Sequence, residues 1–366
     1  MRRRPATYMM LQILPLSKFA HPLRWGILLS LSALFSAILS AAHLPAALLL
    51  GAIIAGILVE MGQAEIHVPK LPFSIAQAII GCLVAKALTL EIIHSFMQRW
   101  PVFLAIVLII IFSCCFLGWV VSKLGILPGT TAIWGLLPGA ASVMMLMSES
   151  FGADGRLVAF MQYLRVVLVA LIASIIAHFW VDASVSTAPI IWFPVVLWLP
   201  FLETLAIILG ATAIGYVWKL PAGMLLIPLF AGSVLHLSGL VDIELPRWLL
   251  AMGYLCIGWQ IGLRFTRKVL LHAARALPQI FVSILSVIMF CGGLAYILTK
   301  LLGIDPLTAY LATSPGGVDA VAIIAASANV NVGFVMTLQL SRALLVIFLG
   351  PVLSRFFSNK LTKSAV

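Results

Sequence analysis

Long apolar segments follow one another along almost the whole chain, and this feature limits the fold more than any other. Aliphatic runs recur from Trp25 nearly to the C-terminus of the 366 residues, and only 9% of the residues are charged. Soluble domains carry about a quarter charged residues. So little polar surface cannot cover a water-exposed core. The sequence therefore predicts an all-α polytopic membrane protein and excludes a soluble enzyme or DNA-binding module as its main body.

The N-terminal segment has two interpretations. Basic residues precede an apolar run that ends at Ser40-Ala41-Ala42, which is the pattern of a signal peptide. However, the next apolar segment starts at once, and the run from Trp25 has a counterpart in the second half of the chain. We interpret residues 1–24 as a cytoplasmic segment and the run from Trp25 as a retained first helix.

Four sequence elements recur in the same order at an offset of 176 or 177 residues. Ordered matches at a near-constant offset indicate a duplicated unit. We expect two membrane repeats of about 160 residues, at 25–180 and 195–357, and a cytoplasmic tail at 358–366. The matching elements are Leu44-Pro45-Ala46 with Leu220-Pro221-Ala222, Ile80-Gly81 with Ile257-Gly258, Pro138-Gly139-Ala140 with Pro315-Gly316-Gly317, and Gln162/Arg165 with Gln339/Arg342.

Each repeat contains six apolar segments, most of them close to the roughly 20 residues that a helix needs to cross a bilayer. The fifth segment is interrupted near its middle by Pro138-Gly139 or Pro315-Gly316, and an internal proline disfavours a continuous helix. The segments are 25–43, 45–60, 72–90, 100–123, 130–148 and 157–179, then 196–218, 221–238, 247–264, 277–300, 307–327 and 332–354.

Positive charge indicates how many segments cross. If the N-terminus is cytoplasmic and all twelve segments cross, 12 Lys and Arg lie inside and 7 outside. If the fifth segment of each repeat re-enters on one side, the distribution becomes 16 inside and 3 outside. The positive-inside rule favours the second topology. Each repeat then has five crossings plus one broken, re-entrant helix, so the repeats are inverted, an architecture typical of secondary transporters.

The two breaks are the first candidate binding elements. Irregular backbone at membrane depth is either buried in protein or lines a cavity, and the half-helix after a break offers free N–H groups. Alternatively, each break is a proline kink with small residues for close packing. Asp319 binds a coupling proton, a cation or a basic solute, or else it caps its half-helix. The candidate residues are Pro138, Gly139, Ala140 and Ser142 with Pro315, Gly316, Gly317 and Asp319.

Two arginines lie near the middle of the sixth segments, too deep for easy access to water. Arg165 and Arg342 each follow a glutamine, Gln162 or Gln339, one turn earlier on the same helix face. A central arginine must face a partner or a cavity. They form either an anion-binding or gating pair, or they neutralise carbonyls freed by the neighbouring breaks. Lys86, within the third segment, is a weaker candidate.

The sequence offers no catalytic site. Seven histidines are scattered singly, five cysteines lie in apolar runs without a CxxC pair, and no His/Cys/carboxylate cluster has metal-site spacing. Walker A and G-x-S-x-G motifs do not occur in the chain. We therefore expect no metal, no cofactor and no enzymatic activity.

Several motifs resemble those of the AbrB family of bacterial inner-membrane proteins. They are LPAALLLG, QAIIGC, PGAAS, GADGRLVAFMQYLRVVLV and PGGVDA with the later QLSR, and the resemblance extends from about Arg24 to Phe357. It implies a duplicated membrane domain, similar to transporter folds with inverted repeats, in the bacterial inner membrane. Family members carry labels such as regulator and ammonia monooxygenase. The chain has neither copper or iron ligand clusters nor a soluble DNA-binding domain, so any regulatory effect would be indirect.

These observations predict a secondary transporter of a small anionic or zwitterionic organic solute, working by alternating access, with both termini cytoplasmic. The alternative is a transporter-like membrane sensor that affects gene expression indirectly, through segments such as 264–276. The expected partners are the lipid bilayer, the solute and either a coupling proton or a cation, without direct contact with nucleic acid. A homo-oligomer remains open.

Overall fold

The structure is a computed structural model built of α-helices. It describes residues 16–125, 127, 129–138, 144–145, 148–149, 152–180, 192–193, 196–218, 223–274, 276–328 and 330–363. A short 3-10 helix, Leu16–Lys18, comes first. The α-helices are α1 (His21–Ala41), α2 (Ala47–Met61), α3 (Lys70–Ala87), α4 (Leu90–Lys123), α5 (Thr131–Leu136), α7 (Gly155–Trp180), α8 (Trp198–Trp218), α9 (Gly223–Leu237), α10 (Arg247–Gly262), α11 (Arg267–Ala273), α12 (Leu277–Leu302), α13 (Pro306–Thr313), α14 (Val318–Ser327) and α15 (Val332–Lys363).

Six of these helices are long and apolar enough to cross a membrane: α1, α3, α4 from Phe96 onward, α7, α8 and α12. Shorter apolar helices accompany them, among them α2, α9 and α14. Large apolar side chains remain on the outside, as at Met289, which is 76% exposed. Such a surface suits lipid rather than water. The prediction of an all-α polytopic membrane protein is confirmed.

The fifth segment of the second half is interrupted as predicted. Residues 307–327 form α13 and α14 with Ser314–Gly317 between them. Asp305 caps α13 by accepting a hydrogen bond from the Thr308 N–H at 2.9 Å. In the first half, the segment starts as α5 and leaves the helix at Leu137. Its continuation lies outside the described residues.

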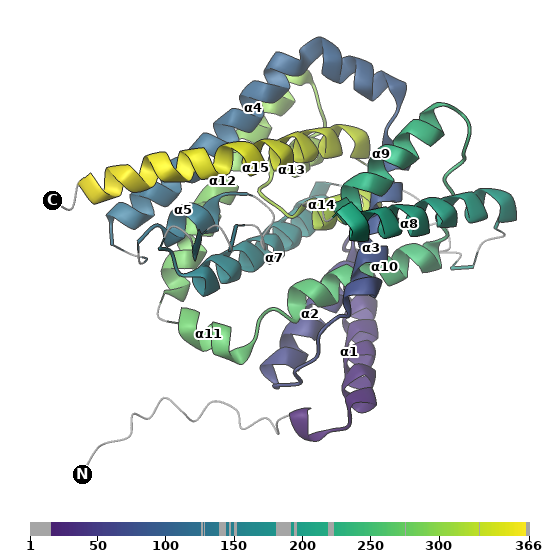
Figure 1. Cartoon of the computed structure of the whole chain (residues 1–366), viewed down its shortest axis with the longest axis horizontal. Helices are drawn as coiled ribbons and strands as arrows, with labels where there is room; N and C mark the ends of the chain where they lie inside the picture. The colour runs from purple at the N-terminus through teal and green to yellow at the C-terminus, as the bar shows by residue number, and fades with distance from the viewer. Residues whose placement is uncertain are drawn as a thin grey trace.

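The helices gather into two groups, which Figure 1 shows side by side. The first bundle consists of α1, α2, α3, α8, α9 and α10, which pack on one another. The second bundle consists of α4, α5, α7, α12, α13 and α15. Helix α14 lies where they meet, because it contacts α7, α13 and α15 on one side and α3 and α10 on the other. The broken segment therefore borders both bundles.

Two short helical stretches connect the bundles. Residues 90–98 form the first part of α4, which is set off by a non-helical residue at Arg99 ahead of Pro101. Helix α11 joins α10 to α12 in the second half. Thr89 and Thr266, 177 residues apart, cap these linking helices by accepting from Ile92 N and Val269 N at 3.4 and 3.3 Å. Figure 1 shows α11 at the bottom and the first part of α4 at the top. The two linking helices thus lie at opposite ends of the molecule.

Glycines allow the closest helix crossings in the first bundle. A Cβ on Gly258 of α10 would lie 2.8 Å from the Leu49 carbonyl oxygen of α2. A Cβ on Gly81 of α3 would lie 2.6 Å from the Leu225 carbonyl oxygen of α9. Close backbone approach of this kind holds helices together in membranes, where lipid is as apolar as the side chains. The conserved offset of 177 between the two glycines means that both halves use the same crossing.

Substituting Gly258→Ala should therefore separate α2 from α10. Overpacking costs about 1–3 kcal/mol, so we expect a lower melting temperature of the purified protein in detergent. The control is Gly210→Ala in α8, where an added Cβ meets nothing within 4 Å. It should leave the melting temperature unchanged or slightly higher. Equal melting temperatures for both variants would contradict the crossing as described.

Candidate functional site

A buried arginine closes the break in the first half. Gln162 and Arg165 of α7 are 1% exposed. The Gln162 side-chain amide donates to the carbonyl oxygens of Trp134 and Leu137, both at 2.9 Å. Arg165 Nη1 donates to the carbonyl oxygens of Leu136 and Leu137 at 3.2 and 3.1 Å. These carbonyls belong to the end of α5, where a helix has no partners of its own for them.

The second half repeats this arrangement residue by residue at an offset of 177. Gln339 of α15 donates to the carbonyl oxygens of Leu311 and Ser314 at 2.6 and 3.1 Å. Arg342 donates from Nη1 to Ser314 O at 2.6 Å and from Nη2 to Gly316 O at 3.1 Å. In both pairs the arginine Nη2 also donates to the glutamine Oε1. Each arginine is held in place by its own glutamine.

This geometry matches the expectation that the arginines neutralise carbonyls freed by the breaks. The hydrogen bonds of Arg165 and Arg342 all lie within the second bundle, joining α7 to α5 and α15 to α13. The Nε atom of each arginine is buried without a hydrogen-bond partner. The two guanidinium groups and the thiols of Cys114 and Cys291, another pair 177 residues apart, lie within electrostatic range of one another. The anion-binding role of the pair stays a prediction.

The remaining break residues are only partly described. Pro138 follows α5 and is buried, whereas Gly139, Ala140 and Ser142 lie outside the described residues. Pro315, Gly316 and Gly317 form the connection between α13 and α14. Gly316 packs tightly, because an added Cβ would lie 2.6 Å from the Val321 side chain. The structure thus brings the second-half candidates together around the start of α14.

Asp319 faces the other bundle. It lies in the first turn of α14, whose N-cap residue is Gly317, so Asp319 is not the cap itself. Its carboxylate accepts a hydrogen bond from Gln77 of α3 at 3.2 Å. An acid in the first turn is favoured by the helix dipole. The Gln77–Asp319 bond links the broken segment to the first bundle.

Lys86 does not lie deep within its helix. It is exposed, in the last turn of α3, one residue before the helix ends at Ala87. The sequence prediction extended this segment to residue 90, but residues 88 and 89 leave the helix and α4 begins at Leu90. Lys86 therefore does not join the residues around the breaks.

One pair of polar positions was missed by the sequence analysis. Asp154 precedes α7 and accepts at Oδ1 from Leu157 N at 3.2 Å, while its own N–H donates to Thr131 Oγ1 at 3.1 Å. Asn331 does the same before α15, accepting from Phe334 N at 2.9 Å and donating to Thr308 at 3.4 Å. The offset of 177 applied to Asp154 would have found both.

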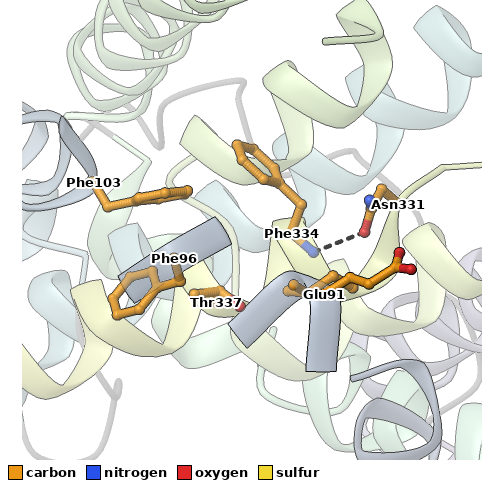
Figure 2. Close-up of a pocket in the computed structure, with 7 residues that line it drawn as sticks. Glu91, Phe96, Phe103, Asn331, Phe334 and Thr337 are labelled. Carbon is orange, nitrogen blue, oxygen red and sulfur yellow. Dashed lines mark hydrogen bonds between the residues drawn. The ribbon is translucent and has the colours of Figure 1, made fainter. Parts of the chain in front are cut away.

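The two ends of the molecule differ at these positions. Asp154 Oδ2 lies 2.7 Å from His272 Nε2 of α11, so the linking helix is tied to the start of α7. At the other end, the start of α15 is separated from residues 90–98 by a cleft of about 220 Å³. Figure 2 shows this cleft, with Asn331 bonded to the Phe334 N–H. One linking helix is therefore latched and the other stands apart. The lining residues are Glu91, Ile92, Phe96, Phe103, Asn331, Phe334 and Thr337.

Metal ligands do not cluster in the described ranges, where no group of three or more His, Cys, Asp or Glu side chains could hold an ion. The ordered polar groups instead form hydrogen bonds to backbone. The arrangement can hold two interrupted helices open at their breaks, and it presents a carboxylate where the bundles meet.

Replacing the buried arginine should destabilise the protein. Arg165→Met leaves the carbonyls at the end of α5 buried without donors, which costs about 2–3 kcal/mol. The matched control is Arg156→Met on the same helix, where the side chain is exposed. Thermal melting in detergent should show a large drop for the first variant and little change for the second. A similar drop for both would show that Arg165 has no special structural role.

The contact between Asp154 and His272 should make stability depend on pH. Burial opposes ionisation of Asp154, but hydrogen bonds from His272 and the Leu157 N–H outweigh it and lower its pKa from the ordinary value of 3.8. A lowered folded-state pKa stabilises the protein above the unfolded pKa, and the stabilisation is lost as pH falls through the folded pKa. Asp154→Asn, which keeps a capping amide as at Asn331, should melt lower than the native protein at pH 7. The difference should vanish as pH falls below about 4. A difference that does not change with pH would contradict this.

Comparison with known proteins supports one family. Residues 14–358 match the family described as "Transition state regulatory protein AbrB". The chain is 45% identical to "Putative regulator AbrB" of Escherichia coli (strain K12), over 92% of this chain and 97% of that protein. It is 23% identical to "Uncharacterized protein YhjN" of Bacillus subtilis (strain 168), over 76% of each. No solved structure matches the chain. With its apolar helices and paired Gln–Arg breaks, the chain belongs to the AbrB family of membrane proteins.

Proposed function

We propose that the protein is a secondary transporter of a small anionic or zwitterionic organic solute and works by alternating access. It is not an enzyme in this proposal. The observation that carries it is the distribution of hydrogen bonds around the broken helices. The Gln–Arg bonds keep both breaks within the second bundle, whereas Gln77–Asp319 joins the second bundle to the first. The second bundle is thus built to move as a unit.

Inverted repeats would supply the two alternating states. The matching hydrogen bonds at an offset of 177 support two equivalent repeats, and the count of 16 positive charges against 3 supports their inversion. In the proposed topology the termini and the α11 end are cytoplasmic, in the bacterial inner membrane. The cleft at residues 90–98 then faces outward. The latch at Asp154–His272 closes the inner end while the outer cleft stands open, and the exchange of these two conditions is alternating access.

The solute class follows from the charges near the breaks. The start of α14 presents the positive end of a helix dipole, and two arginines lie in the core against one acid beside a break. This balance favours a carboxylate-bearing solute. Asp319 would bind the coupling proton or cation and exchange its bond with Gln77 as the bundles shift.

Flux measurements test the proposal. Purified protein is screened by thermal shift against organic acids and amino acids, because a ligand of the folded state raises the melting temperature. Uptake of a stabilising solute into proteoliposomes is then measured under an imposed proton or sodium gradient. Asp319→Asn should reduce gradient-driven uptake about tenfold or more, since an amide cannot exchange the coupling charge. Asp242→Asn, at a carboxyl 91% exposed, should keep native uptake. Native uptake by Asp319→Asn would remove Asp319 from the mechanism.

The name of the E. coli relative supports a second candidate, an indirect membrane regulator. Helix α11 would then carry the signal, because Arg267 and Lys268 lie on it at the proposed cytoplasmic end. Absence of flux for every stabilising solute, together with a transcriptional response lost on Arg267→Gln and Lys268→Gln, would favour this candidate.

A further inference from the structure

The cleft between residues 90–98 and α15 has an unusual set of lining groups for a membrane helix contact. In Figure 2, Phe96 and Phe103 lie at one end and the Glu91 carboxylate lies beside Asn331 at the other. Phe334 and Thr337 of α15 lie between them. The cleft is therefore aromatic at one end and acidic at the other.

Three phenylalanine rings form the apolar part. The Phe103 ring centroid lies 5.0 Å from that of Phe96 and 5.4 Å from that of Phe334, with the ring planes tilted by 50° and 55°. Phe96 and Phe334 are half-buried, so part of each ring stays open. The face of an aromatic ring carries partial negative charge and attracts a cation within about 6 Å.

The polar part consists mainly of acceptors without a cationic partner. Glu91 is exposed, it forms no ion pair with another described residue, and no Lys, Arg or His lines the cleft. Thr337 donates its hydroxyl hydrogen to Gly333 O at 2.8 Å, which leaves its oxygen as an acceptor. Asn331 Oδ1 already accepts from the backbone. A ligand that fits these groups brings hydrogen-bond donors and positive charge.

The matching positions of the other half show that the fold does not require these residues. Moving each lining residue by 177 replaces Glu91 with Lys268, and the three rings with aliphatic side chains. Lys268 reverses the charge, and no matching position keeps an aromatic ring in place of Phe96, Phe103 or Phe334. The acid and the rings therefore occur together in one half only. The aliphatic counterparts are Ala273, Ile280 and Leu157.

We propose that this cleft binds the ammonium group of a small amine that carries an apolar substituent. The ammonium lies between the Glu91 carboxylate and Thr337 Oγ1, and the substituent lies on Phe96 and Phe103. A volume of about 220 Å³ suits a ligand below drug size. The site is independent of the proposed transport, because binding is measured on the purified protein. The ammonium comes from a free amine or from a phosphatidylethanolamine headgroup.

Calorimetric titration of the full-length protein in detergent tests the site. The probe is 2-phenylethylammonium, compared with neutral 2-phenylethanol and anionic phenylacetate, which share its ring and chain length. The ammonium should bind about tenfold or more tightly than either isostere, because only it pairs with the carboxylate. Equal affinity for 2-phenylethanol would overturn the proposal on the native protein alone.

Variants separate the charge from the rings. Glu91→Gln should weaken ammonium binding about tenfold, and Glu91→Asp should keep part of it. Phe96→Leu should weaken it about threefold to tenfold through the lost ring face. Glu65→Gln, an exposed acid on a different loop, is the matched control and should bind like the native protein. Melting temperatures of the free variants check folding. Native affinity in both Glu91→Gln and Phe96→Leu would overturn the proposal.

The source of the ammonium is decided in nanodiscs. Phosphatidylethanolamine added to phosphatidylglycerol nanodiscs should weaken the apparent affinity for the probe if the headgroup occupies the cleft. The effect should disappear in Glu91→Gln. An affinity independent of phosphatidylethanolamine assigns the site to a free amine. Both results support ammonium recognition, whereas failure of the isostere comparison refutes it whatever the outcome of the flux assays.

Discussion

Backbone groups freed inside a membrane must find partners within the protein, and the rest of this structure depends on how that is done. A broken helix exposes carbonyls where no water can bond them. Here a Gln–Arg pair from the sixth segment of each half supplies the donors, at Gln162/Arg165 and at Gln339/Arg342. The cost of placing an arginine at membrane depth is offset by carbonyls that would otherwise be unsatisfied. The breaks are therefore rigid parts of the second bundle rather than loose connections.

The contrast between rigid breaks and separable bundles gives the proposed mechanism its physical basis. Within the second bundle, buried charge-assisted hydrogen bonds fix α5 to α7 and α13 to α15. Between the bundles, contacts at α14 include the Gln77–Asp319 bond, and short linking helices join the two ends. Movement costs least where the fewest such bonds must break. The difference between the latched α11 end and the open cleft at Glu91 is what one of two alternating states would show.

The sequence predicted the helical membrane fold well because its signals are local. Apolar length found the segments, and Pro315-Gly316 placed the break between α13 and α14. The offset of 177 found the Gln–Arg pairs and, applied further, would have found Asp154 with Asn331. Lys86 was misplaced because apolarity continues through Leu88 and Leu90 while the helix itself ends at Ala87. The Gln77–Asp319 bond and the aromatic cleft could not be predicted, since both depend on how distant helices pack.

Distances between the bundles test the central claim most directly. Spin labels on Met61 and Arg156 report on the α11 end, and labels on Lys86 and Leu301 report on the other end; all four positions are exposed. Distances are measured by pulsed electron resonance in nanodiscs across pH and with a stabilising solute. Alternating access predicts that one distance lengthens as the other shortens, with two populations in each pair. A single unchanged distance in both pairs under every condition that supports flux would contradict the account.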